Sequence, residues 1–159
     1  MFFMKKIILL IFVLVLLLTA CAESNVESIA PHSIEPRKTE SFLDVFDRSG
    51  FEYTVGEEKS SDSFFSVERQ YILIGDDIIS FYEYDTNEAM EADAACVDSG
   101  GCSINVPGRS VCISWVSLPH FYKKDNVIVN YVGENEQILD FLEENYGEEF
   151  AGAGKRACA

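Results

Sequence analysis

The apolar N-terminal segment most strongly limits what this chain can fold into, because it divides the sequence into two parts suited to different environments. Lys5 and Lys6 precede Ile7–Leu18, which is an uninterrupted apolar run. A helix that crosses a bilayer needs about 20 such residues, so this run is short for a membrane span. A positive start followed by a short apolar run is typical of a secretory signal peptide. We therefore predict that residues 1–20 are removed on export and that folding concerns the remainder.

The residues that end this segment predict a lipid anchor. Leu18-Thr19-Ala20-Cys21 resembles the lipobox of bacterial lipoproteins. The resemblance implies cleavage before Cys21, a diacylglycerol thioether and an acyl chain such as palmitate on Cys21, and membrane anchoring through these chains. Ala22 is not the aspartate that commonly retains lipoproteins at the inner membrane, so the outer membrane is favoured if the host has two. An ordinary signal peptide or an uncleaved anchor is the alternative.

Charge restricts the partners that the exported part can have. The chain has 27 acidic side chains against 12 Lys and Arg, and its net charge is −15 at pH 7. This charge argues against nucleic acid as a partner, because phosphates require basic side chains. It also argues against adhesion to an anionic membrane by charge. The expected partners are the membrane, through the lipid anchor, and an envelope protein.

The mature chain is predicted to consist of a tether, one domain and a frayed tail. Residues 21–40 hold the lipidated cysteine and then a polar segment with two prolines and no sustained apolar period, which is typical of a flexible tether. Residues 41–152 are long enough for one domain. Residues 153–159 are expected to form the tail.

The domain is predicted to be a single compact α+β unit with an antiparallel sheet and about three helices packed on one of its faces. Ser41 and Asp44 have the spacing of a capping box at the start of the first helix. The second helix is expected to open at Asp85 and the third to cover residues 134–146. Strands are expected at 51–55, 64–67, 71–74, 78–84, 103–106, 111–116 and 126–132.

A weak internal repeat runs through this pattern. Ile78, Ile79 and Tyr82 correspond to Val127, Ile128 and Tyr131, and a helix with an acidic start follows each set. The match favours a tandem β-β-α arrangement, and chance similarity between two such units is the alternative.

Five short segments of the domain resemble recurring segments of an uncharacterised family of small bacterial lipoproteins. They are Ser41-Phe42-Leu43, Phe81-Tyr82-Glu83-Tyr84, Pro119-His120-Phe121-Tyr122, Tyr131-Val132-Gly133 and Phe150-Ala151-Gly152. The resemblance covers about residues 41–152 and implies a lipid-anchored exported domain, without an established activity, substrate or catalytic residue. The domain cysteines depart from the family's pattern, so disulfides are expected to be an addition to the fold rather than its basis.

Four cysteines remain once Cys21 carries lipid, and an even number outside the cytoplasm favours disulfides. They are Cys96, Cys102, Cys112 and Cys158. Cys102 and Cys112 lie symmetrically about Pro107 in the expected hairpin, so we favour a disulfide between them. A Cys96–Cys102 pairing is the alternative, and Cys158 is expected to be free or to pair with Cys96 or another molecule.

No metal and no cofactor other than the covalent lipid is expected. Zinc sites place cysteines in close pairs, and the gap between Cys96 and Cys102 is too wide. The C-x-x-C motif of redox catalysts is missing. Acidic pairs such as Asp76-Asp77 lack the loop spacing of a calcium site and are interpreted as solvated turns.

His120 is the only histidine in the predicted domain, so any histidine-dependent chemistry there must use it. It lies in an expected connection between two strands. The candidate binding residues are Trp115, His120, Phe121 and Tyr122. A structural histidine is the alternative. No G-x-S-x-G motif surrounds Ser114 or Ser117, so no catalytic residue is assigned.

A second candidate surface is aromatic. Neighbouring residues of a strand point to opposite faces of its sheet. One set of aromatic side chains is expected to fill the core, and Tyr82, Tyr84 or Tyr131 is expected to line an exposed face that binds a partner.

These observations favour a non-enzymatic, membrane-anchored lipoprotein whose domain binds a protein or ligand in the cell envelope. One alternative is an envelope hydrolase, which requires a concave pocket with His120 beside Ser114, Ser117 or a carboxylate. Another is an inhibitor of an exported enzyme, which rests on fold analogy alone.

Overall fold

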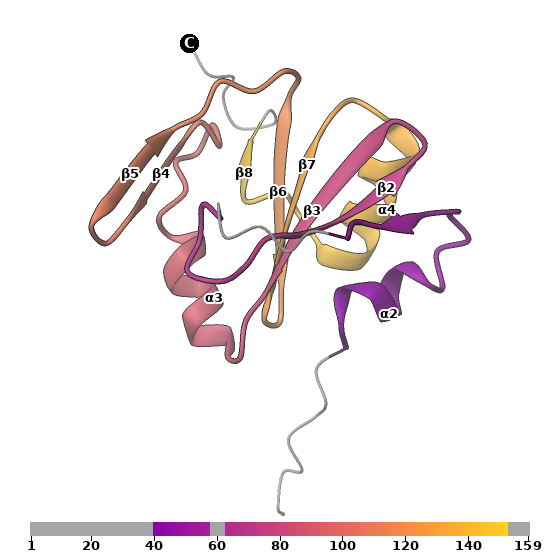
Figure 1. The fold of residues 1–159 in the computed structure, drawn as a ribbon, viewed down its shortest axis with the longest axis horizontal. Coiled ribbons are helices and arrows are strands. Elements are labelled where there is room, and N and C mark those ends of the chain that lie inside the picture. Colours follow the sequence, from indigo (N-terminus) through magenta and orange to yellow (C-terminus); the bar gives the residue numbers. More distant parts are fainter. Residues whose placement is uncertain (1–39, 58–62, 153–159) are drawn as a thin grey trace, which may run out of the picture. The chain divides into compact units, whose positions relative to one another are not determined.

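A central antiparallel sheet organises the domain (Figure 1). The computed structural model describes residues 40–57 and 63–152, so the predicted signal peptide, Cys21, the tether up to residue 39, and the tail with Cys158 lie outside the described residues. The described helices are α2 (Phe42–Phe46), α3 (Asn87–Ala94) and α4 (Glu136–Tyr146). The described strands are β1 (Thr54–Val55), β2 (Gln70–Ile74), β3 (Asp77–Glu83), β4 (Ser103–Val106), β5 (Arg109–Cys112), β6 (Pro119–Lys124), β7 (Val127–Val132) and β8 (Ala151–Gly152).

Strands β3 and β7 form the centre of the main sheet. Its order is β1-β2-β3-β7-β6-β8, and each neighbouring pair is antiparallel. In the β3–β7 register, Phe81 lies opposite Val129, and Ser80 lies opposite Asn130. Because side chains alternate along a strand, these two pairs point to opposite faces of the sheet. One face therefore has an apolar centre and the other a polar one.

The face with the apolar centre is covered by α2 and α4. Phe42 and Phe46 of α2, together with Ile138 and Leu142 of α4, are fully buried in one cluster with Phe81. The rings of Phe42 and Phe81 are stacked, with centroids 4.1 Å apart. Burial of aromatic and aliphatic side chains of this size is the main favourable contribution to folding.

The predicted capping box at the start of α2 is confirmed. The Ser41 hydroxyl accepts a hydrogen bond from the Asp44 backbone N–H, and the Asp44 carboxylate accepts one from the Ser41 N–H. The carboxylate of Glu83 accepts a further bond from the Phe42 N–H at 2.9 Å. Strand β3 thereby satisfies a backbone donor that the first turn of a helix leaves unpaired.

The opposite face is covered by α3, the separate β4–β5 hairpin and the segment around Phe65 (Figure 1). Met90 of α3 and Ile104 of β4 are buried here with Tyr82. The carboxylate of Asp93 accepts hydrogen bonds from the Ser66 N–H, the Ser66 hydroxyl and the Tyr84 hydroxyl at 2.7, 2.7 and 3.0 Å.

The predicted α+β class with a largely antiparallel sheet is confirmed, but the prediction that the helices share one face is wrong. Helices α2 and α4 pack on one face and α3 on the other. The tandem repeat is not confirmed. The two units to compare are β2-β3-α3 and β6-β7-α4. If one unit is rotated within the plane of the sheet so that β3 and β7 run in the same direction, β2 and β6 lie on the same side of them, but α3 and α4 lie on opposite faces of the sheet. The two units are therefore not superimposable.

Several element boundaries differ from the prediction for local reasons. Thr86 caps α3 and Asn135 caps α4, in place of the acidic residues one position earlier. Residues 64–67 form no strand, although Phe65 is buried. A connection was expected at residues 119–124, but the structure has strand β6 (Pro119–Lys124) there. Pro119 is compatible with this strand because it occupies the first position, where proline is tolerated.

The predicted exposed aromatic face is not formed by the three tyrosines considered for it. Tyr82, Tyr84 and Tyr131 are 0%, 3% and 0% exposed. Burial raises the pKa of Tyr82 and of Tyr131 to about 12, and raises the pKa of Tyr84 further still. The prediction assumed that one face of the sheet was open to solvent. The three tyrosines are buried because α2 and α4 cover one face, and α3 and the β4–β5 hairpin cover part of the other.

The favoured Cys102–Cys112 disulfide is absent. Cys96 and Cys112 are free thiols, and Cys102 is disulfide-bonded to neither of them. The hairpin turn is Pro107-Gly108, so Ser103 and not Cys102 lies opposite Cys112. A register shift of one residue sends a side chain to the other face of a hairpin. The centre of the hairpin lies between Pro107 and Gly108 and not at Pro107, so Cys102 and Cys112 are not cross-strand partners.

No helix within residues 40–57 and 63–152 is long and apolar enough to cross a membrane.

The cysteine assignment predicts a specific labelling pattern. Alkylation of the unfolded, unreduced protein should modify Cys96 and Cys112, and Cys102 should become reactive only after reduction. Peptide mapping by mass spectrometry distinguishes the three positions. A peptide in which Cys102 is linked to Cys112 would contradict the register of the hairpin.

Candidate functional site

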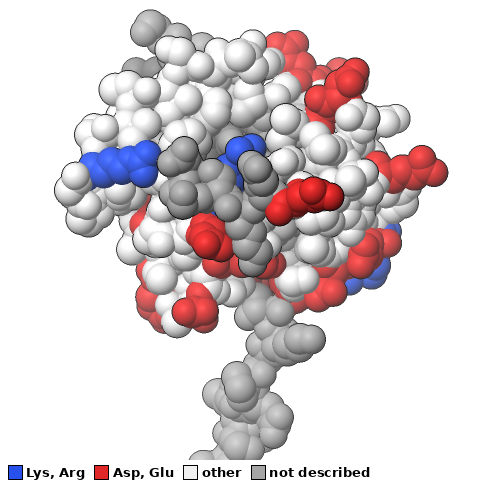
Figure 2. All heavy atoms as spheres, in the orientation of Figure 1, with Lys and Arg blue, Asp and Glu red and all other residues white. Residues whose placement is uncertain are grey.

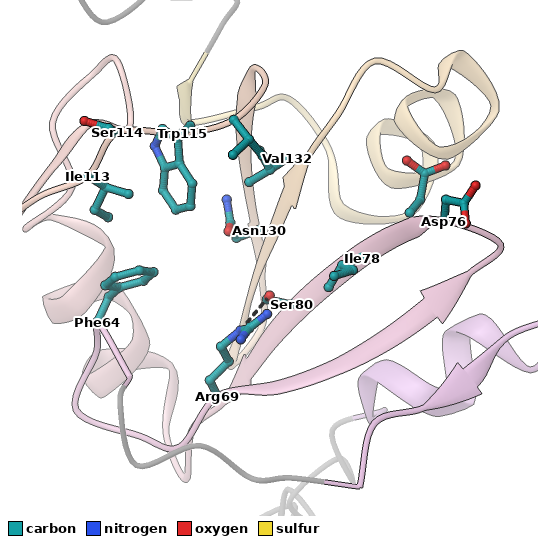
Figure 3. Close-up of a pocket in the computed structure, with 12 residues that line it drawn as sticks. Phe64, Arg69, Asp76, Ile78, Ser80, Ile113, Ser114, Trp115, Asn130 and Val132 are labelled. Atoms are coloured by element: carbon teal, nitrogen blue, oxygen red, sulfur yellow. Dashed lines mark hydrogen bonds between the residues drawn. The ribbon is translucent and has the colours of Figure 1, made fainter.

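A pocket of about 470 Å³ lies on the part of the second sheet face that α3 and the β4–β5 hairpin leave uncovered (Figure 3). Its floor comes from β3 and β7, through Ile78, Ser80, Asn130 and Val132. The segment 113–116 and Phe64 form one wall, and Arg69 lies on another side (Figure 3). Ligand pockets typically have volumes of about 300–1,000 Å³.

The floor of the pocket is polar at its centre. Ser80 and Asn130 are register partners on β3 and β7 and are 5% and 4% exposed. The Ser80 hydroxyl accepts a hydrogen bond from Arg69 Nε at 2.9 Å, and Asn130 Nδ2 donates to the His120 backbone carbonyl at 3.5 Å. Figure 3 shows Arg69 reaching Ser80 from the edge of β2, with Asn130 on the neighbouring strand.

The wall opposite Arg69 is aromatic. The Trp115 indole N–H donates to the Gly101 carbonyl at 2.8 Å, and its ring meets Phe64 edge to face, with centroids 5.9 Å apart. Gly101 has a φ of +70°, and a Cβ there would lie 2.9 Å from the ring of Phe121. Glycine is therefore required at the position that accepts the Trp115 hydrogen bond and lies against Phe121.

His120 lies on the other side of the sheet. It is 7% exposed, and its Nδ1 and Nε2 atoms lie 3.2 Å from a Glu149 carboxylate oxygen and 3.1 Å from the Gly133 carbonyl oxygen. Its ring stacks on Tyr131, with centroids 6.1 Å apart. Each ring nitrogen therefore lies within hydrogen-bond distance of an oxygen atom. This arrangement fits the alternative that His120 has a structural role rather than a binding role.

The four predicted binding residues are not brought together. Alternation along β6 places His120 and Tyr122 on the face covered by α4, whereas Phe121 points to the face that carries Trp115. Of the four, Trp115 lines the pocket. Ser114 lines it as well, so the predicted neighbourhood of His120 and Ser114 is not formed, because the sheet separates them.

The sequence interpretation missed most of this site. Phe64, Arg69, Ile78, Ser80, Asn130 and Val132 line the pocket and were not proposed. Ser80 and Asn130 carried a usable signal, since each is a polar residue that interrupts an apolar run within its strand. Arg69 carried none, because its place depends on the β2–β3 register.

The pocket's acidic rim does not form a metal centre. Asp77 accepts hydrogen bonds from the Tyr131 hydroxyl at 2.8 Å and from Asn135 Nδ2 at 3.0 Å, which fastens the β2–β3 turn to the start of α4. Within the part of the chain that the structure describes, no group of three His, Cys, Asp or Glu residues is placed to hold a metal ion.

Comparisons with known proteins add no assignment: no family model, no curated protein and no solved structure matches the chain. The resemblance to small bacterial lipoproteins stays a prediction.

The contacts of His120 predict a structural effect of its removal. His120→Ala leaves the Glu149 carboxylate and the Gly133 carbonyl without their partner and opens a cavity, so the free energy of unfolding should fall by about 2–4 kcal/mol. Denaturant unfolding measures this change. Leu118→Ala, at a residue that is 38% exposed nearby, serves as the control and should stay within about 0.5 kcal/mol of wild type. Equal stability of His120→Ala and wild type would contradict a structural role.

Proposed function

We propose that this protein is an exported, lipid-anchored binding protein whose domain takes up a small ligand in the pocket beside Trp115. The pocket carries the proposal, because its described lining combines six apolar or aromatic residues with six polar ones. That combination is typical of ligand sites, in which apolar contact supplies affinity and polar groups fix orientation.

The anchor is supported by the sequence. The short apolar run before Leu18-Thr19-Ala20-Cys21 and the polar tether that follows are the features expected of a chain held by acyl chains on Cys21. A tether of this kind would hold the domain off the membrane with its pocket open to extracytoplasmic ligands.

A binding role without catalysis is favoured by the arrangement of side chains around the pocket. Its polar lining consists of Arg69, Asp76, Asp77, Ser80, Ser114 and Asn130. Asp77 and Ser80 already hold structural hydrogen bonds. The hydrolase alternative required a concave pocket with His120 beside Ser114, Ser117 or a carboxylate. His120 does lie beside the Glu149 carboxylate, but it does not line this pocket, and the sheet separates it from Ser114.

The anchor makes a direct prediction for the intact chain. Cys21→Ser removes the sulfur atom that would carry lipid, so the protein should leave the membrane fraction. Cell fractionation and the intact mass of the mature protein measure the loss of the anchor. Cys112→Ser, at an exposed free thiol of the domain, is the matched control and should remain at the membrane. Retention of Cys21→Ser at the wild-type level would overturn the lipid anchor.

The pocket can be probed through its tryptophan, which is the only one in the chain. Added benzyl alcohol, a neutral aromatic probe, should shift the single indole N–H resonance of Trp115 in a ¹⁵N spectrum until the pocket is saturated. Ile78→Phe narrows the pocket and should weaken this response about tenfold or more, because the larger side chain occupies the probe's space.

A matched variant controls for changes in surface hydrophobicity. Val55→Phe enlarges an apolar side chain on β1 that is 45% exposed, against 44% for Ile78, and Val55 does not line the pocket. It should therefore bind benzyl alcohol like wild type. A Trp115 signal that does not respond in the wild-type protein, or responds equally in Ile78→Phe, would contradict the proposed site.

A further inference from the structure

We infer that the pocket selects a monoanionic carboxylate joined to a compact aromatic or aliphatic body, with the carboxylate held by Arg69. This inference rests on the proposed function and names the chemical class of its ligand. The observations that carry it are the unused donors of Arg69, its missing counter-charge, and the aromatic wall opposite.

Arg69 is held in place while most of its hydrogen-bonding capacity stays free. Its Nε donates to the buried Ser80 hydroxyl at 2.9 Å, and its guanidinium carbon lies 5.1 Å from the centroid of the Tyr71 ring. Among the described residues, the bond to Ser80 is the one hydrogen bond that the Arg69 side chain makes. The N–H groups on its two Nη atoms are the pair that binds a carboxylate in bidentate fashion.

The charge of Arg69 has no partner within the described part of the domain. Arg48 and Lys123 form ion pairs with Glu40 and Glu91, whereas Arg69, like Arg109 and Lys124, forms none with a described carboxylate. Arg69 is the one of these three that lines the pocket, in a chain with a net charge of −15 that shows many acidic side chains on the face in Figure 2. A half-buried cation without a counter-ion favours binding of an anion from solution.

The size of the charge favours a carboxylate over a phosphate. Arg69 is the one basic residue among the described residues that line the pocket. Two acids line it as well: Asp76, which Figure 3 shows beyond Ile78, and Asp77. A dianion would meet one cation and two nearby acids, whereas a single negative charge is matched by Arg69 alone. The buried Asn130 amide lies on the floor beside Ser80, where it can hydrogen-bond to a polar group of the ligand.

The rest of the pocket fits the apolar body of such a ligand. Trp115 and Phe64 meet edge to face on one side, and Ile78 and Val132 come from the floor. An aromatic or branched aliphatic group placed there would displace water from these side chains while its carboxylate remained on Arg69. Two sources share this chemistry: a free small acid, and the C-terminal carboxylate of a peptide that ends in an apolar residue.

Paired ligands that differ only in charge test the inference. Quenching or shift of Trp115 fluorescence is titrated with 3-phenylpropionate and with its neutral amide, and then with N-acetyl-Ala-Phe bearing a free or an amidated C-terminus. The wild-type protein should bind each acid about tenfold or more tightly than its amide. Tighter binding of phenylpropionate would identify a free acid as the source, and tighter binding of the dipeptide a peptide C-terminus; both results support the carboxylate site.

Substitution of Arg69 locates the source of this preference. Arg69→Gln should lower affinity for the acids about tenfold while binding of the amides is kept, which also shows that the variant is folded. Arg69→Lys keeps the charge but not the bidentate geometry and should show an intermediate preference. Arg48→Gln, which removes an arginine that does not line the pocket, should bind like wild type.

The possible failures can be told apart. Equal binding of acids and amides by the wild-type protein would overturn the carboxylate inference while the pocket remained a binding site. A preference for acids that survives in Arg69→Gln would overturn the role of Arg69. The lack of a Trp115 response to benzyl alcohol and to every acid and amide would overturn both the inference and the proposed function.

Discussion

The register between β3 and β7 is the constraint on which the rest of the domain depends. It places Phe81 opposite Val129 on one face and Ser80 opposite Asn130 on the other. The apolar pair supports the cluster that holds α2 and α4, and the polar pair forms the floor of the pocket. A shift of one residue would turn the side chains of one strand to the opposite face, so that on β7 Asn130 would lie under the two helices and Val129 would face the pocket. Core and site are therefore fixed by the same hydrogen bonds.

The two faces of the sheet have different tasks. Helices α2 and α4 cover the first face with large aromatic and aliphatic side chains, and His120 is buried there between Glu149 and Gly133. On the second face, α3 and the β4–β5 hairpin cover one part and leave the pocket beside Trp115. Arg69 lies in this uncovered part, where no described helix packs over it and supplies acceptors for its remaining N–H groups. The proposed binding role follows from this uneven coverage.

Local features were predictable from the sequence, and features set by strand pairing were not. The capping box at Ser41, the hairpin at Gly75-Asp76 and the turn at Pro107-Gly108 follow from short-range residue chemistry. The Cys102–Cys112 disulfide failed because the turn centre decides which side chains face each other. The binding set around His120 failed because Pro119 begins a strand, and alternation then divides the set between two faces. Arg69 reaches Ser80 through the β2–β3 register, which no local pattern displays.

The position of a bound carboxylate tests the central claim most directly. A crystal structure of the protein with 3-phenylpropionate would show where the acid lies on the domain. The account predicts its carboxylate on the Nη atoms of Arg69 and its phenyl ring between Trp115 and the floor residues Ile78 and Val132. A phenylpropionate bound elsewhere, or a pocket that stays empty at saturating concentration, would contradict the assignment of this part of the sheet as the binding site.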